Sequence, residues 1–323
     1  MDGDNQAAYL TPGGSLQLRC APFNARAMSN PNPTARDLVA ELESLLTVSR
    51  MADGWYLGQR KAGGVGRVFG GQVIAQALAA AQDTVEPERI AHSLHAYFMR
   101  PGDEDYEITY RVERDFDGGS FSTRRIIALQ QDRPILNMAA SFQKLEEGYY
   151  HQQPMPDVPP PEELKDEVQL RAEYADRIPE KGRDHFLRDR AFESRPVDPR
   201  DWLGGDKREP ARQDIWFRLR APTVNDAAMH RAMLAYQSDS WLLGTSTLAH
   251  GVTWLTPGFQ SASLDHAVWL HGDFRVDDWL LYSCDSPWSG RGRGFNRGSI
   301  YTRDGRLVAT CAQEGLIRMR TPK

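Results

Sequence analysis

Three polar residues interrupt otherwise apolar segments in the second half of the chain. Asp239 lies near the end of an apolar helical pattern, Ser263 opens a strand pattern, and Gln313 interrupts the apolar run LVATCA. A carboxylate, a hydroxyl and an amide that meet at one point can hold and polarise a water molecule, which suits general-base hydrolysis without a covalent intermediate. A purely structural interpretation stays open at this point: Asp239 in a helix-terminal turn, Ser263 as an ordinary strand serine and Gln313 as an edge residue.

The sequence lacks the motifs of several other catalytic classes. It contains no GxSxG nucleophile elbow, no GxxxxGK(S/T) phosphate loop, no HExxH and no GxGxxG between a strand and a helix. Four histidines lie in predicted strands at spacings that do not put each pair on one strand face: His92, His95, His266 and His271. We expect structural hydrogen bonds for them, and we predict chemistry that uses no metal and no cofactor.

The composition is that of a globular protein with room for about two domains, since 323 residues are 40% hydrophobic and 26% charged. Thirty-nine Lys and Arg stand against 44 Asp and Glu, a net charge of −5, so no global field recruits nucleic acid or an anionic membrane. Three cysteines without metal-ligand spacing favour a reducing compartment. With no apolar run of about 18 residues and no SKL-type C-terminal address, we expect a cytoplasmic protein.

Hydrophobic periodicity predicts helices and then strands in the first half. The spacing of leucines favours an amphipathic helix over 35–48, and the Gly-started, Ala-rich segment 70–81 is typical of a buried central helix. Alternation then predicts antiparallel strands at 106–113, 120–130 and 134–143. The order is therefore helix followed by an antiparallel meander.

The second half repeats this order in outline. A single helix is predicted over 226–243. Strands are predicted at 191–198, 213–220, 262–272, 279–286, 294–303 and 307–319. His95 and His266 on the one hand, and Phe121 and Phe295 on the other, lie at nearly equal separations along the chain, as in a duplicated unit. Two sheets that each enclose a helix can join edge to edge, an α+β arrangement.

Composition also predicts the boundaries of these units. Residues 1–35 mix Gly, Pro, Asn and Ala without periodicity and are predicted to be a flexible tail, although a start codon assigned too early, upstream of Met28, is an equal alternative. The first unit covers 36–148 and the second 189–323. Between them, 149–188 is a Pro-rich and charged linker.

Six segments together resemble the acyl-CoA thioesterase II family. They are GGQVIAQAL (70–78), HSLHAYFMRPGD (92–103), GGSFSTRRIIALQ (118–130), LAYQSD (234–239), ASLDHAVWLH (262–271) and GRGFNRGSIYTRDGRLVATCAQEGLIR (292–318). The resemblance implies a double hot-dog fold, in which two antiparallel sheets each wrap a central helix and join into one sheet. It also implies a catalytic set of Asp, Thr or Ser, and Gln, carried over to Asp239, Ser263 and Gln313. In the first unit, Ala140 and His92 stand at the positions of Gln313 and Ser263.

Substrate-binding candidates follow from the same resemblance. Backbone N–H groups at Gly71 and Gln72, which start the central helix, are candidates for stabilising an oxyanion. Coenzyme A carries three phosphate groups, and three arginines in a Gly-punctuated segment are candidates for binding them: Arg291, Arg293 and Arg297. A solvated basic turn is the alternative for these arginines.

The sequence therefore predicts an enzyme that hydrolyses fatty acyl-CoA to a free fatty acid and coenzyme A. Two alternatives remain, a non-catalytic module that binds acyl-CoA and a hot-dog hydratase that acts on enoyl thioesters. The expected partner is the acyl-CoA substrate, with no nucleic acid and no membrane. Because sheet edges tend to pair, we also expect a homo-oligomer.

Overall fold

The computed structural model describes residues 33–61, 64, 66–178 and 180–320, together with two short strands that precede them. These strands, β1 (Tyr9–Leu10) and β2 (Leu16–Gln17), pair with each other in antiparallel fashion. The remainder of the predicted tail up to residue 32 lies outside the described residues. The folded body begins with helix α1 (Ala35–Leu46), whose first turn is closed by a capping box between Thr34 and Asp37.

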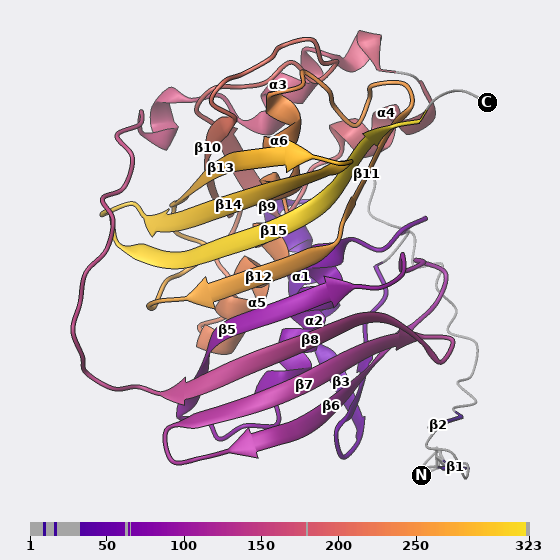
Figure 1. The fold of residues 1–323 in the computed structure, drawn as a ribbon, viewed down its shortest axis with the longest axis vertical. Coiled ribbons are helices and arrows are strands. Elements are labelled where there is room, and N and C mark those ends of the chain that lie inside the picture. Colours follow the sequence, from indigo (N-terminus) through magenta and orange to yellow (C-terminus); the bar gives the residue numbers. More distant parts are fainter. Residues whose placement is uncertain are drawn as a thin grey trace.

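Thirteen strands form one antiparallel sheet that runs through both halves of the chain (Figure 1). The first half supplies β3 (Val48–Ala52), β4 (Trp55–Gly58), β5 (Arg89–Phe98), β6 (Ile108–Asp117), β7 (Phe121–Gln130) and β8 (Arg133–Lys144). The second half supplies β9 (Phe192–Pro196), β10 (Arg212–Leu219), β11 (Phe259–Ser263), β12 (Asp265–Leu270), β13 (Leu280–Gly290), β14 (Arg293–Thr302) and β15 (Leu307–Met319). The order is β3-β4-β6-β7-β8-β5-β12-β15-β14-β13-β10-β9, with β11 paired to β15.

The two halves meet at the pair β5–β12, where Leu94 lies opposite Val268 and Ala96 opposite His266. Behind the sheet lie two central helices, α2 (Gly70–Gln82) and α5 (Ala227–Ser238), which pack against each other (Figure 1). Alanines along α2 are buried, and their small side chains allow this close approach. Two helices, each wrapped by a sheet and joined through a shared strand pair, are the double hot-dog fold that the sequence predicts.

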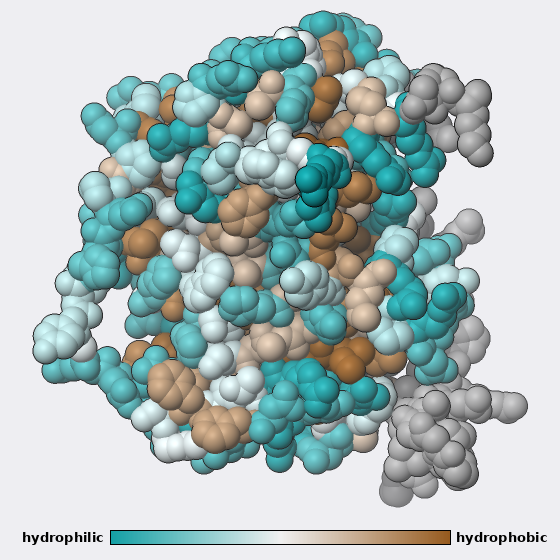
Figure 2. Space-filling model, in the orientation of Figure 1, coloured by the Kyte–Doolittle hydropathy of each residue, from teal (hydrophilic) through white to brown (hydrophobic). Residues whose placement is uncertain are grey.

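The sheet separates a buried face from an exposed one. Side chains that point toward α2 and α5 form the main apolar core. The opposite face, shown in Figure 2, carries hydrophilic and hydrophobic side chains side by side, and Tyr97 on β5 is 64% exposed there. No helix among the described ranges combines the length and the apolar character that a bilayer crossing requires.

The segment that connects the halves first runs as an extended chain and then as short helices: η1 (Pro161–Glu163), α3 (Glu167–Ala172), η2 (Ala175–Arg177) and α4 (Glu180–Leu187). The extended part arches away from the body in Figure 1 and then returns to it. There the indole N–H of Trp216 donates a hydrogen bond to the carbonyl of Pro159 at 2.9 Å. The predicted boundaries at 36–148, 149–188 and 189–323 remain a prediction.

Two predicted elements are wrong because the chain breaks inside them. The helix predicted over 226–243 is divided into α5 and α6 (Leu242–Leu248), and Trp241 between them has a left-handed backbone (φ 53°). Asp239 ends α5, since short polar side chains favour helix termini over helix interiors. The strand predicted over 262–272 is divided at Leu264 into two strands, β11 and β12.

Candidate active site

The structure brings Asp239, Ser263 and Gln313 together. The Gln313 amide donates a hydrogen bond from Nε2 to Asp239 Oδ1 at 2.6 Å, and the same nitrogen lies 3.2 Å from Ser263 Oγ. Ser263 Oγ lies 3.4 Å from Asp239 Oδ1, a distance at the long limit of a hydrogen bond. A carboxylate from a helix end and two polar groups from neighbouring strands therefore share one point.

A β-bulge allows Ser263 to reach this point. Ser263 pairs with Gly315 and Ala267 with Ala312, so β11 and β12 span one more residue than the facing stretch of β15. The Asp265 carboxylate accepts the N–H of Glu314 at 2.6 Å within this irregular stretch. In a regular strand, residues three apart face opposite sides, whereas an extra residue redirects the side chains that flank it. Ser263 and the residue at 266 consequently both face Gln313.

Burial tunes the carboxyl group toward a basic role. The pKa of Asp239 is raised from 3.8 to about 6, mainly because the group is removed from solvent. Hydrogen bonds from the Gln313 side chain, the Gly71 N–H and the Ser263 hydroxyl act in the opposite direction and limit the rise. The carboxylate is then ionised at neutral pH and still accepts a proton readily, as a general base requires.

His266 belongs to the site, although the sequence analysis treated it only as a structural histidine. Its Nδ1 lies 3.1 Å from Gln313 Nε2, and its Nε2 lies 2.8 Å from the hydroxyl of Ser238. Burial lowers its pKa to about 3, so the ring is neutral, and Nδ1 accepts from the Gln313 amide while Nε2 donates to Ser238. His266 thereby turns the Gln313 amide so that its nitrogen faces Asp239. No pattern in the sequence marks this contact, because it depends on the bulge at Leu264 and Asp265.

Two buried amide oxygens at the site have no hydrogen-bond partner within the part of the chain that the structure describes. They are Gln313 Oε1 and Asn296 Oδ1, on residues that lie opposite each other in β15 and β14. Both side chains are fully buried. Buried acceptors without a protein partner are normally satisfied by water or by a ligand. The oxygen of Gln313 is therefore available to a water molecule beside Asp239.

The first half contributes to the site through the start of α2. A Cβ at Gly70 would lie 2.7 Å from Asp239 Oδ2, and one at Gly71 would collide with the backbone carbonyl of Tyr236. The Gly71 N–H donates to Asp239, and the Gln72 N–H donates to the carbonyl of Phe69 at 3.1 Å. Both N–H groups that were predicted to stabilise an oxyanion thus have other acceptors, and Gly71 supports the carboxylate instead.

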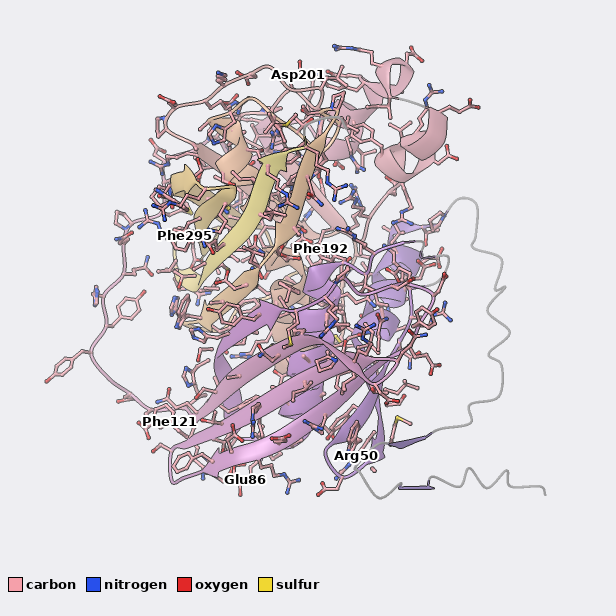
Figure 3. All side chains as sticks on the ribbon, turned by 45° about the vertical axis from the view of Figure 1, so that its right-hand side comes forward. Arg50, Glu86, Phe121, Phe192, Asp201 and Phe295 are labelled. Atoms are coloured by element: carbon pink, nitrogen blue, oxygen red, sulfur yellow. The ribbon has the colours of Figure 1, made fainter. Side chains whose placement is uncertain are left out.

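Aromatic rings surround the helix turn that precedes Asp239. The ring of Tyr236 meets Phe69 of the first half edge-on, with centroids 5.0 Å apart, and stacks on Phe192 of the second half at 6.5 Å. Figure 3 places Phe192 where the two halves meet. The site therefore lies at the boundary between the halves and depends on both of them.

The predicted phosphate-binding arginines lie away from this point. Gln313 and its strand neighbour Asn296 face inward, whereas Arg293 and Arg297 alternate with the buried positions of β14 and point outward. Arg297 pairs with Asp285, and Arg293 pairs with Glu314 at 3.3 Å. Arg291 occupies the exposed turn between β13 and β14 (φ 51°). The geometry therefore does not favour these arginines as the phosphate site.

His92 and His271 make the structural hydrogen bonds that were expected, whereas His95 makes only an aromatic contact among the described residues. His92 lies 2.8 Å from the hydroxyl of Ser141, and His271 lies 3.0 Å from that of Thr310. His95 is exposed and meets Trp269 edge-on at 5.0 Å. Because His95 faces outward and His266 inward, the sequence match between them does not pair equivalent positions. Among the described residues, no group of three or more acidic, His or Cys side chains could hold a metal ion.

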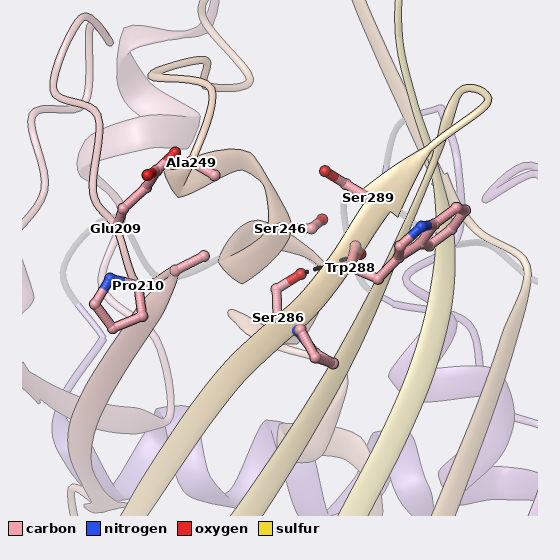
Figure 4. Close-up of a pocket in the computed structure, with 9 residues that line it drawn as sticks. Glu209, Pro210, Ser246, Ala249, Ser286, Trp288 and Ser289 are labelled. Carbon is pink, nitrogen blue, oxygen red and sulfur yellow. Dashed lines mark hydrogen bonds between the residues drawn. The ribbon is translucent and has the colours of Figure 1, made fainter.

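A hollow of about 390 Å³ lies beside α6, between that helix and the β13 bulge (Figure 4). Ser246, Ser286 and Trp288 are among the residues that line it. None of the residues predicted for catalysis does so. This hollow is therefore separate from the point where Asp239 and Gln313 meet.

Comparisons with known proteins show the family of the chain. Residues 59–143 match the family model of the acyl-CoA thioesterase N-terminal domain, and residues 157–317 match that of the C-terminal domain. Acyl-CoA thioesterase 2 of Haemophilus influenzae is 38% identical over 282 residues, which cover 87% of this chain and 98% of that protein. The chain belongs to the acyl-CoA thioesterase II family.

Further members of the family are similar over most of the chain. Human acyl-coenzyme A thioesterase 8 is 41% identical over 79% of this chain and 81% of its own length. The crystal structure of acyl-CoA thioesterase II TesB2 from Mycobacterium marinum superposes with a TM-score of 0.71 at 38% identity, and covers 88% of this chain and 99% of that one. Both halves of the double hot-dog thioesterase are therefore present.

Proposed function

We propose that this acyl-CoA thioesterase hydrolyses fatty acyl-CoA through a water molecule that Asp239 activates and that Ser263 and Gln313 orient. The observation that carries the proposal is the contact of 2.6 Å between Gln313 and a carboxylate whose pKa is raised to about 6. A buried base with a pKa just below neutrality is suited to remove a proton from water at neutral pH. No covalent intermediate is required.

In the proposed mechanism, the attacking water lies between Asp239 and the free Gln313 Oε1. One water proton passes to the Asp239 carboxylate as the water oxygen forms a bond to the thioester carbon. The carbonyl oxygen becomes an oxyanion, and the loosely held hydroxyl of Ser263 can turn to donate to it. Collapse of this intermediate breaks the carbon–sulfur bond. The proton on Asp239 then passes to the leaving thiolate, which restores the carboxylate and yields the fatty acid and coenzyme A.

Thiol release from acyl-CoA substrates tests this function. Purified protein is incubated with acyl-CoA of several chain lengths and a thiol reagent, beside the variants Asp239→Ala, Ser263→Ala and Gln313→Ala. We expect release by the wild type with at least one chain length and a loss of about 100-fold or more in the variants. Absence of release at every chain length, or full activity of Asp239→Ala, would contradict the proposal.

Two further parts of the proposal rest on composition and sheet geometry. Cys284 and Cys311 are buried free thiols, which supports a reducing, cytoplasmic location. The edge strands β3 and β9 leave the ends of the sheet available for pairing, which supports self-association into a homo-oligomer. Cell fractionation tests the location, and sedimentation analysis tests the oligomeric state.

A further inference from the structure

We propose that four basic residues, Arg60, Lys61, Arg188 and Arg190, form the site that binds the phosphate groups of the acyl-CoA substrate. We refer to them as the basic cluster. The proposal deepens the proposed function, because it rests on acyl-CoA being the substrate. It is offered in place of Arg291, Arg293 and Arg297, which the sequence alone favoured.

The basic cluster is assembled from two distant segments of the chain. Arg60 and Lys61 follow β4 on the way to α2, whereas Arg188 and Arg190 lie between α4 and β9. Glu104 links the segments. Arg60 Nε donates a hydrogen bond to its backbone carbonyl at 3.0 Å. Burial raises the pKa of its carboxyl group, and the positive charges of Lys61 and Arg188 act in the opposite direction. The first half and the linker therefore present cations to one place.

Within the part of the chain that the structure describes, the charges of the cluster are not paired with acids by direct contact. Among the described residues, none of the four cluster members forms a salt bridge, although most exposed arginines of the sheet do. Glu104 is 6% exposed, whereas the arginines of the cluster are exposed to solvent. Burial, together with the charge of Arg188, lowers the pKa of Lys61 to about 8. Two acids act on Lys61, the buried Glu104 and the exposed Glu41. Four crowded cations beside these two acids still form a local positive field, which favours a multiply charged anion.

The cluster lies on the approach to the catalytic carboxyl group. Tyr236 is one helical turn before Asp239, and both are partly exposed, while Ala235, Gln237 and Ser238 are buried. Tyr236 and Asp239 are therefore the residues of this turn that the core does not enclose completely, although the Asp239 carboxyl group itself is largely removed from solvent.

The same tyrosine connects this turn to the cluster. Phe192, two residues after Arg190, stacks on the Tyr236 ring with centroids 6.5 Å apart. Burial raises the pKa of Tyr236, and the positive charges of Arg190 and Arg188 act in the opposite direction. A ligand whose thioester lies at Asp239 can thus extend past Tyr236 toward the cluster. Coenzyme A has this form, because its phosphates lie at the far end of a long neutral arm.

The experiment compares two substrates, one with and one without the adenosine and the three phosphate groups of coenzyme A. Hydrolysis of one acyl-CoA and of the acyl-pantetheine thioester with the same acyl chain is measured for the wild type and for the double variant Arg188→Ala/Arg190→Ala. We expect KM for acyl-CoA to rise about tenfold or more, with kcat within about twofold, because exposed charge-assisted contacts contribute to binding and not to the reacting atoms. Neither kcat nor KM for acyl-pantetheine should change by more than about twofold.

Matched controls separate this effect from a general loss of charge. The variant Arg111→Ala/Arg114→Ala removes one half-buried and one exposed arginine from β6 and should leave both substrates unaffected. Arg188→Lys/Arg190→Lys keeps the charge and should recover most of the affinity. An unchanged KM in the alanine variant, equal losses with both substrates, or a rise in KM for Arg291→Ala/Arg297→Ala instead would overturn the proposal.

Two further outcomes identify the source of a negative result. If the wild type hydrolyses neither thioester, the proposed function fails, and the cluster loses its basis. If adenosine 3′,5′-bisphosphate inhibits the wild type no better than inorganic phosphate at the same concentration, the cluster is a general anion site and the assignment to coenzyme A is wrong. We expect the bisphosphate to compete with acyl-CoA, and the alanine variant to lose this inhibition.

Discussion

The two central helices end in the same residue type, but only one of these ends has the environment of a catalytic base. α2 is capped at its C-terminus by Asp83 and α5 by Asp239. Asp83 is exposed and accepts a hydrogen bond from the hydroxyl of Tyr56 at 2.7 Å. Asp239 is bonded to Gln313 and to the start of α2, and burial raises its pKa. The surroundings of an aspartate, and not its place at a helix end, decide whether it can act as a base.

The strands behind these helix ends differ in the same way. In the first half, Leu94 pairs with Ala140 across β5 and β8, and both side chains are buried in the core. In the second half, the inward-facing neighbours are His266 and Gln313, whose side chains contact each other. One half thus retains an apolar core where the other holds polar groups. We infer a single catalytic site in each chain.

Removing the charge from each aspartate is the strongest test of this difference. We expect Asp239→Asn to lower kcat for acyl-CoA by about 1000-fold, because general-base catalysis contributes about 10²–10⁴-fold. Asp83→Asn should change kcat by less than about twofold. Steady-state kinetics at neutral pH provide the measurement, and similar losses in the two variants would show that the halves are functionally equivalent.

Replacing the amide of the second half by an apolar group, as in the first half, should have the next largest effect. We expect Gln313→Leu to lower kcat about 100-fold and to move the acid limb of kcat/KM to higher pH. In the wild type this limb should lie near pH 6, and the Gln313 hydrogen bond that lowers the pKa of Asp239 is lost in the variant. The control Thr310→Val lies on the outer face of β15 and should keep the wild-type profile. A limb that stays in place would mean that another group titrates.

The buried charge should also reduce the stability of the second half. The pKa of Asp239 is about 6 in the folded protein and 3.8 in its absence, a difference that corresponds to about 3 kcal/mol of unfolding free energy. This contribution is fully present below pH 3.8, where the group is protonated, and is lost as the pH rises through 6. We therefore expect Asp239→Asn to raise the free energy of unfolding by up to about 3 kcal/mol at pH 7, and by little at pH 4. Urea unfolding at the two pH values measures this. If Asp239→Asn were less stable than the wild type at pH 7, burial of the charged carboxylate would not be destabilising.

A methyl group at the contact between the halves should have the smallest effect. Gly71→Ala brings a Cβ against the backbone carbonyl of Tyr236, which cannot move without shifting α5. We expect a loss of about 1–3 kcal/mol in the free energy of unfolding, typical of overpacking. Gly119→Ala is the matched control, since nothing lies within 4 Å of its added Cβ. Equal thermal stability of the two variants would show that the helices separate easily.

Much of this fold follows from local patterns in the sequence. The predicted central helix over 70–81 corresponds to α2, and the strand predicted at 307–319 corresponds to β15, because periodicity reports which side chains face a core. The breaks at Trp241 and Leu264 escaped prediction, since each depends on packing between elements that are distant in sequence. Asp239, Ser263 and Gln313 could be singled out as polar residues in apolar segments, and the resemblance to the family then predicted their role.

The parts of the site that were missed are relations across space. His266 contacts Gln313 only because a bulge changes the register, and Gly71 contacts Asp239 only because the two halves pack together. Neither contact has a signature in the spacing of residues along the chain. The arginines of β14 were favoured by proximity in sequence, although alternation in a strand places them on the outer face.

The pairing of β5 with β12 inside one polypeptide has a consequence for how such a protein can change. In a symmetric assembly of identical subunits, every mutation appears in all copies at once. A substitution that favours catalysis in one subunit therefore also enters the subunit in which the same position serves only packing. Here each unit has its own codons. A leucine or alanine can be retained where only packing is needed, and a carboxamide where hydrolysis is proposed, without compromise between the two demands.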